Sequence, residues 1–303
     1  MRVVVTGATS MIGIALIKEC LKKNVEVLAI IRKESSRIKR LPKSDLIKIE
    51  YADIDSLSLI HKTDMKYDVF YHLAWSHTTK AERDCPLLQE ENIQGTLQAV
   101  ALAHRLGCKK FVGAGSQAEY GYVKGVITET TKTNPVIAYG IAKLSAYMLS
   151  KRMCEQYGMV HIWGRIFSVY GIYDNEGTML NYAIDQFIRG EVACFSSAIQ
   201  KWNYLNEIDA GVMLYLFGEK NVESGIYCIA NNESRVLREY IEVLQKEYGP
   251  NARCEFENVD SEKEVVELEV DMSKTIDAIS YVPQISFQIG VRMMIENCCG
   301  KNN

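Results

Sequence analysis

The sequence predicts an α/β fold with a parallel central sheet, and three observations support this prediction. Short apolar runs alternate with longer amphipathic stretches through the first half of the chain, which is typical of strand–helix–strand units. A glycine-containing turn, residues 6–13, separates the first apolar run from the first amphipathic stretch. The chain has 303 residues, 48% of them hydrophobic and 24% charged, which suffices for a large core with a smaller lobe beside it.

The elements of the first half follow from these patterns in chain order. The apolar runs predict strands at Arg2–Thr6, Val25–Ile31, Asp45–Tyr51, Val69–Leu73, Lys110–Ala114 and Val160–Trp163. The amphipathic stretches predict helices at Met11–Lys23, in a long stretch that ends near Leu106, and from just after Pro135 to about Tyr157.

Beyond Arg165 the alternation becomes less regular. The segment Asn251–Val270 is rich in Glu and Asp, so we expect it to lie outside the main core. Helices are expected near Thr178–Arg189, Glu207–Leu216 and Arg235–Tyr248, with short strands such as Ile226–Ala230 between them.

Charge and cysteine content narrow the class of protein. The formal net charge is −3, which argues against nucleic acid or a membrane surface as the main partner, because both bind a concentrated basic face. None of the nine cysteines forms a C-x-x-C motif, so we expect reduced thiols and predict no metal site. No charged leader precedes an apolar run, and no apolar run reaches about 18 residues. We therefore expect a cytoplasmic protein without a membrane span.

The turn from Thr6 to Gly13 predicts a dinucleotide site. Glycine permits positive φ and close approach of the backbone to a pyrophosphate, and the following helix N-terminus supplies unpaired N–H groups and partial positive charge. Gly7 and Gly13 have the outer spacing of a G-x-x-G-x-x-G turn, with Ser10 at the central position. We therefore predict a Rossmann-type doubly wound parallel sheet. Its expected turn contacts are Gly7, Thr9, Ser10, Met11, Ile12 and Gly13.

This prediction divides the chain into two parts. The dinucleotide-binding domain is expected at residues 1–165, with a contribution from about residues 200–230. A smaller, discontinuous substrate-binding lobe is expected at residues 166–303. No Pro/Gly/Ser-rich linker separates them, so we expect the two parts to share a cleft.

The end of the second predicted strand indicates which dinucleotide binds. An NAD site usually places Asp or Glu there to bond the ribose 2′-hydroxyl, whereas a 2′-phosphate requires cations. Here Arg32 and Lys33 end the strand and Arg37 follows, so we favour NADP(H). The alternatives are NAD(H), or a basic loop that is simply solvated. Further cofactor contacts are expected after the third and fourth strands, at Asp53, Ile54, Leu73 and Ala74.

Tyr139 and Lys143 are the candidate catalytic pair. A spacing of four residues on a helix puts both side chains on one face. A cation beside a phenol favours the phenolate, so we expect Lys143 to lower the pKa of Tyr139 from its usual value of about 10. Such a phenol can exchange a proton with a hydroxyl–ketone couple. Ser116, after the fifth predicted strand, can donate a hydrogen bond to the same substrate oxygen, so we predict that all three are catalytic. We also expect Tyr139 and Lys143 to contact the cofactor, because the lysine can hold the nicotinamide ribose.

The same Tyr–Lys spacing occurs at two other places. Tyr120 and Lys124 belong to a glycine-containing loop, where four residues need not form one helical turn. Tyr147 and Lys151 lie two turns further along the helix, away from the strand ends. The position of Tyr139 near the helix start therefore selects it.

These residues resemble the extended short-chain dehydrogenase/reductase family, and within it the nucleotide-sugar epimerases, dehydratases and reductases. The resemblance covers most of the chain and is strongest over residues 1–171, where Thr6–Gly13 is similar to the family's glycine-rich turn. The other similar segments are Tyr71–Ala74 (H-L-A), Glu91–Thr96 (N-x-x-G-T), Arg165–Gly171 (R-x-x-N-V-Y-G) and, more faintly, Trp202–Glu207 (R-D-F-x-x-V-D-D).

The resemblance implies a Ser116–Tyr139–Lys143 triad and a C-terminal lobe that binds a nucleoside-diphosphate sugar. It also implies a homodimer formed through a four-helix bundle that includes the Tyr139 helix. Gln117 and Ala118 stand where family dehydratases carry an Asp-Glu pair, so dehydration is disfavoured. Ser168 replaces the family's sugar-facing Asn. The family's phosphate-binding Arg is absent, and Lys201 stands near the position where it is expected. The expected substrate contacts are Ser116, Gln117, Ser168 and Lys201.

Three functions remain open. The favoured one is reduction of a 4-keto sugar nucleotide by NADPH, because the acid after the second strand and the dehydratase Asp-Glu pair are both missing. The second is a nucleotide-sugar C4 epimerase that retains NAD. The third is a non-catalytic dinucleotide-sensing protein, although such relatives typically lack the Tyr–Lys pair that is intact here.

Overall fold

The computed structural model describes residues 1–60, 65–257 and 265–300. Within these residues the central sheet has seven strands in the order β11-β6-β5-β4-β1-β2-β3, and every neighbouring pair is parallel. The α/β prediction with a doubly wound parallel sheet is confirmed. The strands are β1 (Arg2–Thr6), β2 (Glu26–Ile31), β3 (Ile47–Tyr51), β4 (Val69–His72), β5 (Lys110–Ser116), β6 (Val160–Ile166) and β11 (Gly225–Ile229).

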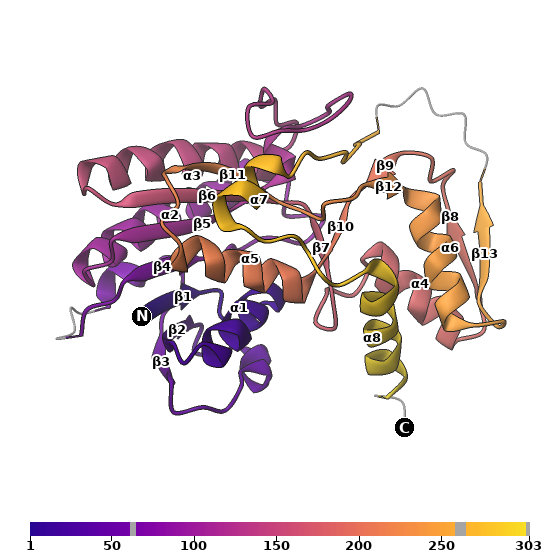
Figure 1. Ribbon diagram of the computed structural model, residues 1–303, viewed down its shortest axis with the longest axis horizontal. Coiled ribbons are helices and arrows are strands. Elements are labelled where there is room, and N and C mark those ends of the chain that lie inside the picture. Colours follow the sequence, from indigo (N-terminus) through magenta and orange to yellow (C-terminus); the bar gives the residue numbers. More distant parts are fainter. Residues whose placement is uncertain (61–64, 258–264, 301–303) are drawn as a thin grey trace.

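Helices cover both faces of this sheet (Figure 1). Val3 and Val5 pack into the core on one face, while Val4 packs into the core on the other. Burial on both faces explains why the strands read as continuous apolar runs. The first face is covered by α1 (Met11–Lys22), α5 (Glu207–Glu219) and α7 (Ser273–Ile279), and the second by α2 (Pro86–Arg105) and α3 (Ala138–Gln156).

The strand order reverses between β1 and β4. From β1 the chain continues to β2 and β3 on one side, and from β4 to β5 and β6 on the other. In a parallel sheet this reversal opens a crevice at the carboxyl ends of the strands, where ligands bind. The glycine turn after β1 lies at that point.

A third hydrophobic cluster lies beside the sheet, at the right of Figure 1. Phe187, Tyr240 and Phe287 are buried in it. It is built by α4 (Met179–Ile188), β8 (Val192–Phe195), α6 (Leu237–Tyr248), β13 (Arg253–Phe256) and α8 (Phe287–Cys299). Two short strand pairs lie between it and the sheet, namely β7 (Ser168–Tyr170) with β10 (Tyr204–Asn206), and β9 (Lys201–Trp202) with β12 (Arg235–Val236). Three short 3-10 helices complete the described elements: η1 (Ser36–Arg40), η2 (Leu57–Leu59) and η3 (Gln117–Glu119).

The structure corrects one expectation about the acidic segment 251–270. Leu268 and Val270 are buried in the main core, and Val270 forms a parallel bridge with Ile127. Apolar residues interspersed among the acids carry this end of the segment inward, so its predicted position outside the core is wrong there. Residues 258–264 of the segment lie outside the described residues.

Strand β5 extends two residues beyond its predicted end and finishes at Ser116. This extension places the Ser116 hydroxyl directly at the carboxyl edge of the sheet. None of the described helices is both long enough and apolar enough to cross a membrane.

Candidate active site

The turn after β1 has the geometry that its glycines predict. Gly7 has φ of +68°, and a Cβ atom there would lie 2.7 Å from backbone atoms of Leu73 and Ala74. Ser10, at the central position, is the N-cap of α1, and its Oγ accepts from the Gly13 N–H at 3.0 Å. A serine therefore replaces the central glycine because it caps the helix. N–H groups in the first turn of a helix have no partner inside the helix, so a helix N-terminus at this turn suits the binding of an anion.

A cleft of about 900 Å³ extends from this turn past the end of β2 to the segment after β4. Glu34, which the sequence analysis did not consider, also lines it. The expectation that no acid follows the second strand is therefore wrong, because Glu34 lies beside Arg32, Lys33 and Arg37. The predicted cofactor residues that line the cleft are Gly7, Thr9, Ser10, Arg32, Lys33, Arg37, Asp53, Ile54, Leu73 and Ala74.

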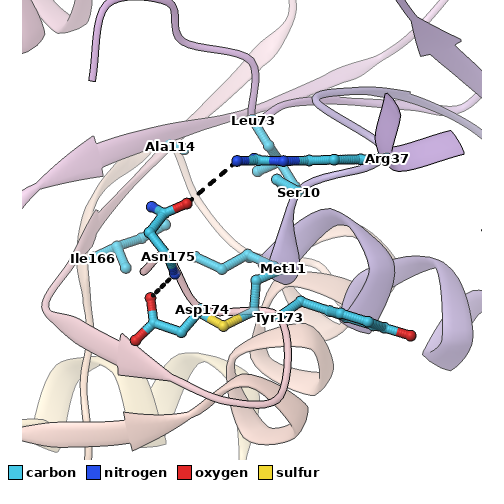
Figure 2. A pocket seen from close by; sticks show the side chains of 10 residues that line it. Ser10, Met11, Arg37, Leu73, Ala114, Ile166, Tyr173, Asp174 and Asn175 are labelled. Carbon is cyan, nitrogen blue, oxygen red and sulfur yellow. Dashed lines mark hydrogen bonds between the residues drawn. The ribbon is translucent and has the colours of Figure 1, made fainter. Parts of the chain in front are cut away.

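A second cavity of about 200 Å³ adjoins the first and shares Ser10, Arg37 and Leu73 with it (Figure 2). Met11 and Ile12, also predicted cofactor residues, line this cavity. Its remaining walls come from the ends of β5 and β6, at Ala114 and Ile166, and from the loop after β7, at Tyr173, Asp174 and Asn175.

The loop after β7 is a contributor that the sequence analysis missed. Arg37 reaches across the cavity, and its Nη2 donates to Oδ1 of Asn175 at 3.4 Å (Figure 2). Glu207, at the start of α5, lies against the backbone of Ile172 and Tyr173, which acts to lower the pKa of this carboxyl, while burial raises it to about 7. The loop is therefore held against the dinucleotide cleft from the α5 side. The sequence feature that could have indicated this loop is its position directly after Arg165–Gly171, the segment similar to R-x-x-N-V-Y-G.

The structure brings Ser116, Tyr139 and Lys143 together. Ser116 ends β5, and Tyr139 and Lys143 lie in the first turns of α3. The Ser116 hydroxyl lies near the phenol of Tyr139 and acts to lower its pKa. Nζ of Lys143 donates to the carbonyl of Ala114 at 2.7 Å, directly behind the smaller cavity. The three side chains thus meet at the carboxyl end of β5.

The expected influence of Lys143 on Tyr139 is wrong. Nζ of Lys143 lies 5.8 Å from the centroid of the Tyr139 ring, but only 3.5 Å from that of Trp75. Burial raises the pKa of Tyr139, and the opposing influences are the Ser116 hydroxyl and the charge of Arg83. Burial also lowers the pKa of Lys143 to about 7. Lys143 shares a helix face with Tyr139, but its amine is held away from the phenol by the Ala114 carbonyl and the Trp75 ring.

Two residues of the segment between β4 and α2 pack against this group, and the sequence analysis missed both. Trp75 lines the large cleft, and its ring meets that of Tyr139 edge-on at 5.9 Å between centroids. Its Nε1 donates to Oε1 of Gln89 at 3.0 Å, which fixes the indole against α2. The guanidinium carbon of Arg83 lies 4.3 Å from the Tyr139 ring centroid. Neither residue belongs to a recognisable motif, so spacing alone gave no signal.

Glu119 is a further residue that was missed, three positions after Ser116. Its carboxylate is fully buried and accepts from the Ser116 backbone N–H at 2.8 Å, from Trp163 Nε1 at 2.9 Å and from Arg165 Nε at 2.7 Å. These three bonds fix the end of β5, and with it the Ser116 hydroxyl.

Ser116, Tyr139 and Lys143 do not themselves line either cavity, and neither do the remaining predicted residues. Gln117 begins η3 and lines neither cavity. Ser168 lies on β7, paired with Tyr204, and also lines neither. Nζ of Lys201 lies 4.0 Å from Glu269 on a partly exposed surface. Gly13 stays behind the turn, where a Cβ would lie 2.3 Å from the Gly7 carbonyl.

Comparisons with known proteins agree with this geometry. Residues 3–230 match the NAD dependent epimerase/dehydratase family. A dTDP-6-deoxy-L-talose 4-dehydrogenase (NAD(+)) of Aggregatibacter actinomycetemcomitans is 34% identical over 145 residues, which are 47% of this chain and 52% of that protein.

Two solved structures share the fold over the full length. UDP-glucose 4-epimerase of Thermotoga maritima, solved with UDP-glucose, has a TM-score of 0.87 at 20% identity and covers 100% of each chain. UDP-glucuronic acid 4-epimerase of Bacillus cereus, solved with UDP-glucuronic acid and NAD, has a TM-score of 0.83 at 22% identity over 99% of this chain and 100% of that one. The chain belongs to the NAD dependent epimerase/dehydratase family, within the extended short-chain dehydrogenases/reductases that its motifs resemble.

Proposed function

We propose that this enzyme reduces a 4-keto sugar nucleotide at C4 with NADPH. The observation that carries the proposal is the convergence of Ser116 and Tyr139 at the carboxyl end of β5, next to Trp75 in the wall of the dinucleotide cleft. A hydroxyl and a phenol that converge there can both bond one substrate oxygen. The partly matching relative from Aggregatibacter, a 4-dehydrogenase, supports chemistry at C4.

The residues of the cleft fit a nicotinamide dinucleotide. The close approach of Gly7 to the backbone of Leu73, together with the capped N-terminus of α1, forms a cradle for a pyrophosphate. Bound there, such a cofactor supplies the hydride. Lys143, behind Ala114, lies at the strand end where the nicotinamide half would be held.

The protonation state of Tyr139 suits the reduction step. Because burial raises the pKa of Tyr139, its hydroxyl keeps its proton at neutral pH. A protonated phenol can give that proton to a ketone oxygen as hydride arrives at the carbon, while Ser116 donates a hydrogen bond to the same oxygen. Oxidation of a hydroxyl, the first step of an epimerase, would instead need a phenolate.

The residues after Ser116 support the absence of a dehydration step. Gln117 and Ala118 provide no acid. The next carboxylate, Glu119, is fully buried and bound to Arg165. No proton donor for the departure of water is therefore present in this segment.

The preference for NADPH rests on Arg32, Lys33 and Arg37, which line the cleft beyond β2. Their positive charge suits a 2′-phosphate. Glu34 lines the same cleft and suits a 2′-hydroxyl, so NADH is the alternative cofactor.

A C4 epimerase that retains NAD is the second candidate. Glu34 in the cleft favours it, together with the likeness to a UDP-sugar epimerase solved with NAD. In either case we propose a nucleoside-diphosphate sugar as substrate, bound between the sheet and the lobe built by α4, β8, α6, β13 and α8. The packing of α5 and β11 against the sheet supports our assignment of about residues 200–230 to the first domain.

The homodimer is also a proposal. Ile141, Met148 and Leu149 are exposed on α3, and Leu87 is exposed on the neighbouring α2. A row of exposed apolar side chains on two packed helices is typical of an interface. A second copy of the chain would cover it by pairing the same two helices.

The test mixes the purified protein with a 4-keto-6-deoxy sugar nucleotide and either NADPH or NADH. We expect NADPH absorbance to fall in proportion to the substrate added. Tyr139→Phe should abolish this loss, whereas Tyr147→Phe, a matched change on the same helix, should retain it. Epimerisation of UDP-sugars without NADPH consumption would establish the second candidate instead. Dinucleotide binding without turnover of either substrate class would indicate the non-catalytic alternative.

A further inference from the structure

We propose that Arg83 is a positioning residue of this site: its guanidinium, stacked on the Tyr139 ring, holds the phenol in place and stabilises the negative charge that forms as the proton leaves. This inference rests on the proposed role of Tyr139 as proton donor. Helix spacing predicts that Lys143 supplies the positive charge that favours the phenolate of Tyr139. The proposal assigns this role to Arg83, which lies between β4 and α2.

The backbone fixes Arg83 against the start of α3. The N–H of Tyr139 donates to the carbonyl of Arg83 at 2.9 Å. The neighbouring Asp84 accepts from the Ala138 N–H at 3.0 Å through Oδ1. N–H groups in the first turn of a helix have no partner within the helix, so these bonds hold the segment in register with α3. The side chain of Arg83 then lies over the Tyr139 ring, at 4.3 Å from guanidinium carbon to ring centroid.

The charge of Arg83 is not neutralised by a carboxylate within the described part of the chain. Among those residues it takes part in no ion pair, and its Nε is buried without a hydrogen-bond partner. Arg165 differs, because its Nε is bound to Glu119 at 2.7 Å. An unpaired guanidinium in a partly buried site keeps a strong field at the ring beneath it.

The other charged groups around Tyr139 are less suited to this role. From α3, Lys143 places its amine 5.8 Å from the ring centroid and against Ala114. From η3, Glu119 opposes ionisation of the phenol, but its charge is largely offset by Arg165. Burial lowers the pKa of Lys143 to about 7, so the lysine loses its charge above neutral pH. A guanidinium stays charged throughout the working range.

The first experiment measures the ionisation of Tyr139 without substrate or cofactor. The full-length protein is labelled with 3-fluorotyrosine, and the fluorine signal of residue 139 is assigned by its loss in Tyr139→Phe. We expect Arg83→Met to raise the pH midpoint of this signal by about one unit or more, because it removes an opposite charge within about 4–6 Å. Arg83→Lys should give a smaller rise. The control Arg152→Met removes an exposed arginine of α3 and should leave the midpoint unchanged.

A second experiment follows turnover as a function of pH. We expect kcat of Arg83→Met to fall about tenfold, the equivalent of one pKa unit, with KM for the dinucleotide unchanged. Arg83→Lys, which keeps a charge and a long side chain, should recover part of kcat. Equal fluorine midpoints in wild type and Arg83→Met would overturn the proposal, even if activity falls. Retained turnover in Tyr139→Phe would refute the proposed function instead, and the fluorine titration would still decide the role of Arg83.

Discussion

Nε of Arg165 donates to Oε2 of Glu119 at 2.7 Å, with both side chains almost completely buried. The other carboxylate oxygen accepts from the backbone of Ser116 and from the indole of Trp163. One buried acid therefore joins β6 to the strand end that presents the catalytic hydroxyl. The bonds of Glu119 therefore hold the end of β5, and with it Ser116, in position beside Tyr139.

Loss of the Glu119 charge should destabilise the fold. Glu119→Gln leaves Arg165 charged and buried without an acid, so we expect the free energy of unfolding to fall by about 3–5 kcal/mol. Glu155→Gln breaks an exposed ion pair with Arg152 and should cost less than about 1 kcal/mol. Urea unfolding of the two variants measures both values, and equal stabilities would show that the buried pair is not required.

Gly7 should be essential for dinucleotide binding because of what surrounds it. Gly7 and Gly158 have nearly the same φ, +68° and +65°, but only Gly7 faces other backbone, while nothing lies within 4 Å of a Cβ at Gly158. We expect Gly7→Ala to weaken NADPH binding at least about tenfold by displacing the turn. Gly158→Ala should leave binding unchanged. Calorimetric titration distinguishes them, and tight binding by Gly7→Ala would contradict the assignment of the turn.

Arg37 should discriminate between the two dinucleotides. If its guanidinium meets a 2′-phosphate, Arg37→Met weakens NADPH binding by about tenfold and leaves NADH binding nearly unchanged. Lys39→Met removes a cation from the same η1 segment that does not line the cleft, and should affect neither. An equal loss for NADPH and NADH would place Arg37 elsewhere along the dinucleotide, for example at the pyrophosphate.

The buried histidine His161 should make the fold sensitive to acid. Its ring stacks on Phe111 and Trp163, and burial lowers its pKa from 6.5 to about 3. Between these two pH values the unfolded chain binds a proton that the folded protein excludes. The free energy of unfolding therefore falls as pH decreases, by at most about 1.4 kcal/mol per pH unit for this site. His161→Phe keeps the stacking, so its free energy of unfolding should decrease less steeply as pH falls. Urea unfolding at several pH values measures this decrease for each protein, relative to that protein's own stability at pH ~8.

The exposed apolar row on α3 should control the oligomeric state. Met148→Glu places a charge in the middle of the proposed interface, so we expect the variant to sediment as a monomer when the wild type sediments as a dimer. Ile199→Glu changes another strongly exposed apolar residue elsewhere and should leave the dimer intact. A wild-type protein that is monomeric at all concentrations would refute the proposal.

Much of the framework could be predicted from local pattern. The strands β1 to β6, the glycine turn and the helices around Tyr139 were expected within a few residues of their observed bounds. The choice of Tyr139 among three Tyr–Lys pairs followed from its distance to the strand ends. Many of the residues that line the cleft, such as Gly7, Asp53 and Ala74, were expected because the carboxyl ends of parallel strands meet at one edge.

Other parts of the site could not be predicted in this way. Lys143 shares a helix face with Tyr139, but its amine binds a carbonyl of β5, which no helical spacing reveals. Glu34 lies beyond the strand end where an acid was sought, and the curve of the chain returns it to the cleft.

The sequence by itself determined the layers of the fold and the class of chemistry, because periodic burial and turn geometry depend on residues close together in the chain. Only the tertiary structure decided which charges face the phenol. Arg83 and Tyr139 are contributed by different segments, as are Glu119 and Arg165, which are 46 positions apart. Their contacts exist only once the sheet and its helices have packed, since burial then sets both their partners and their pKa values.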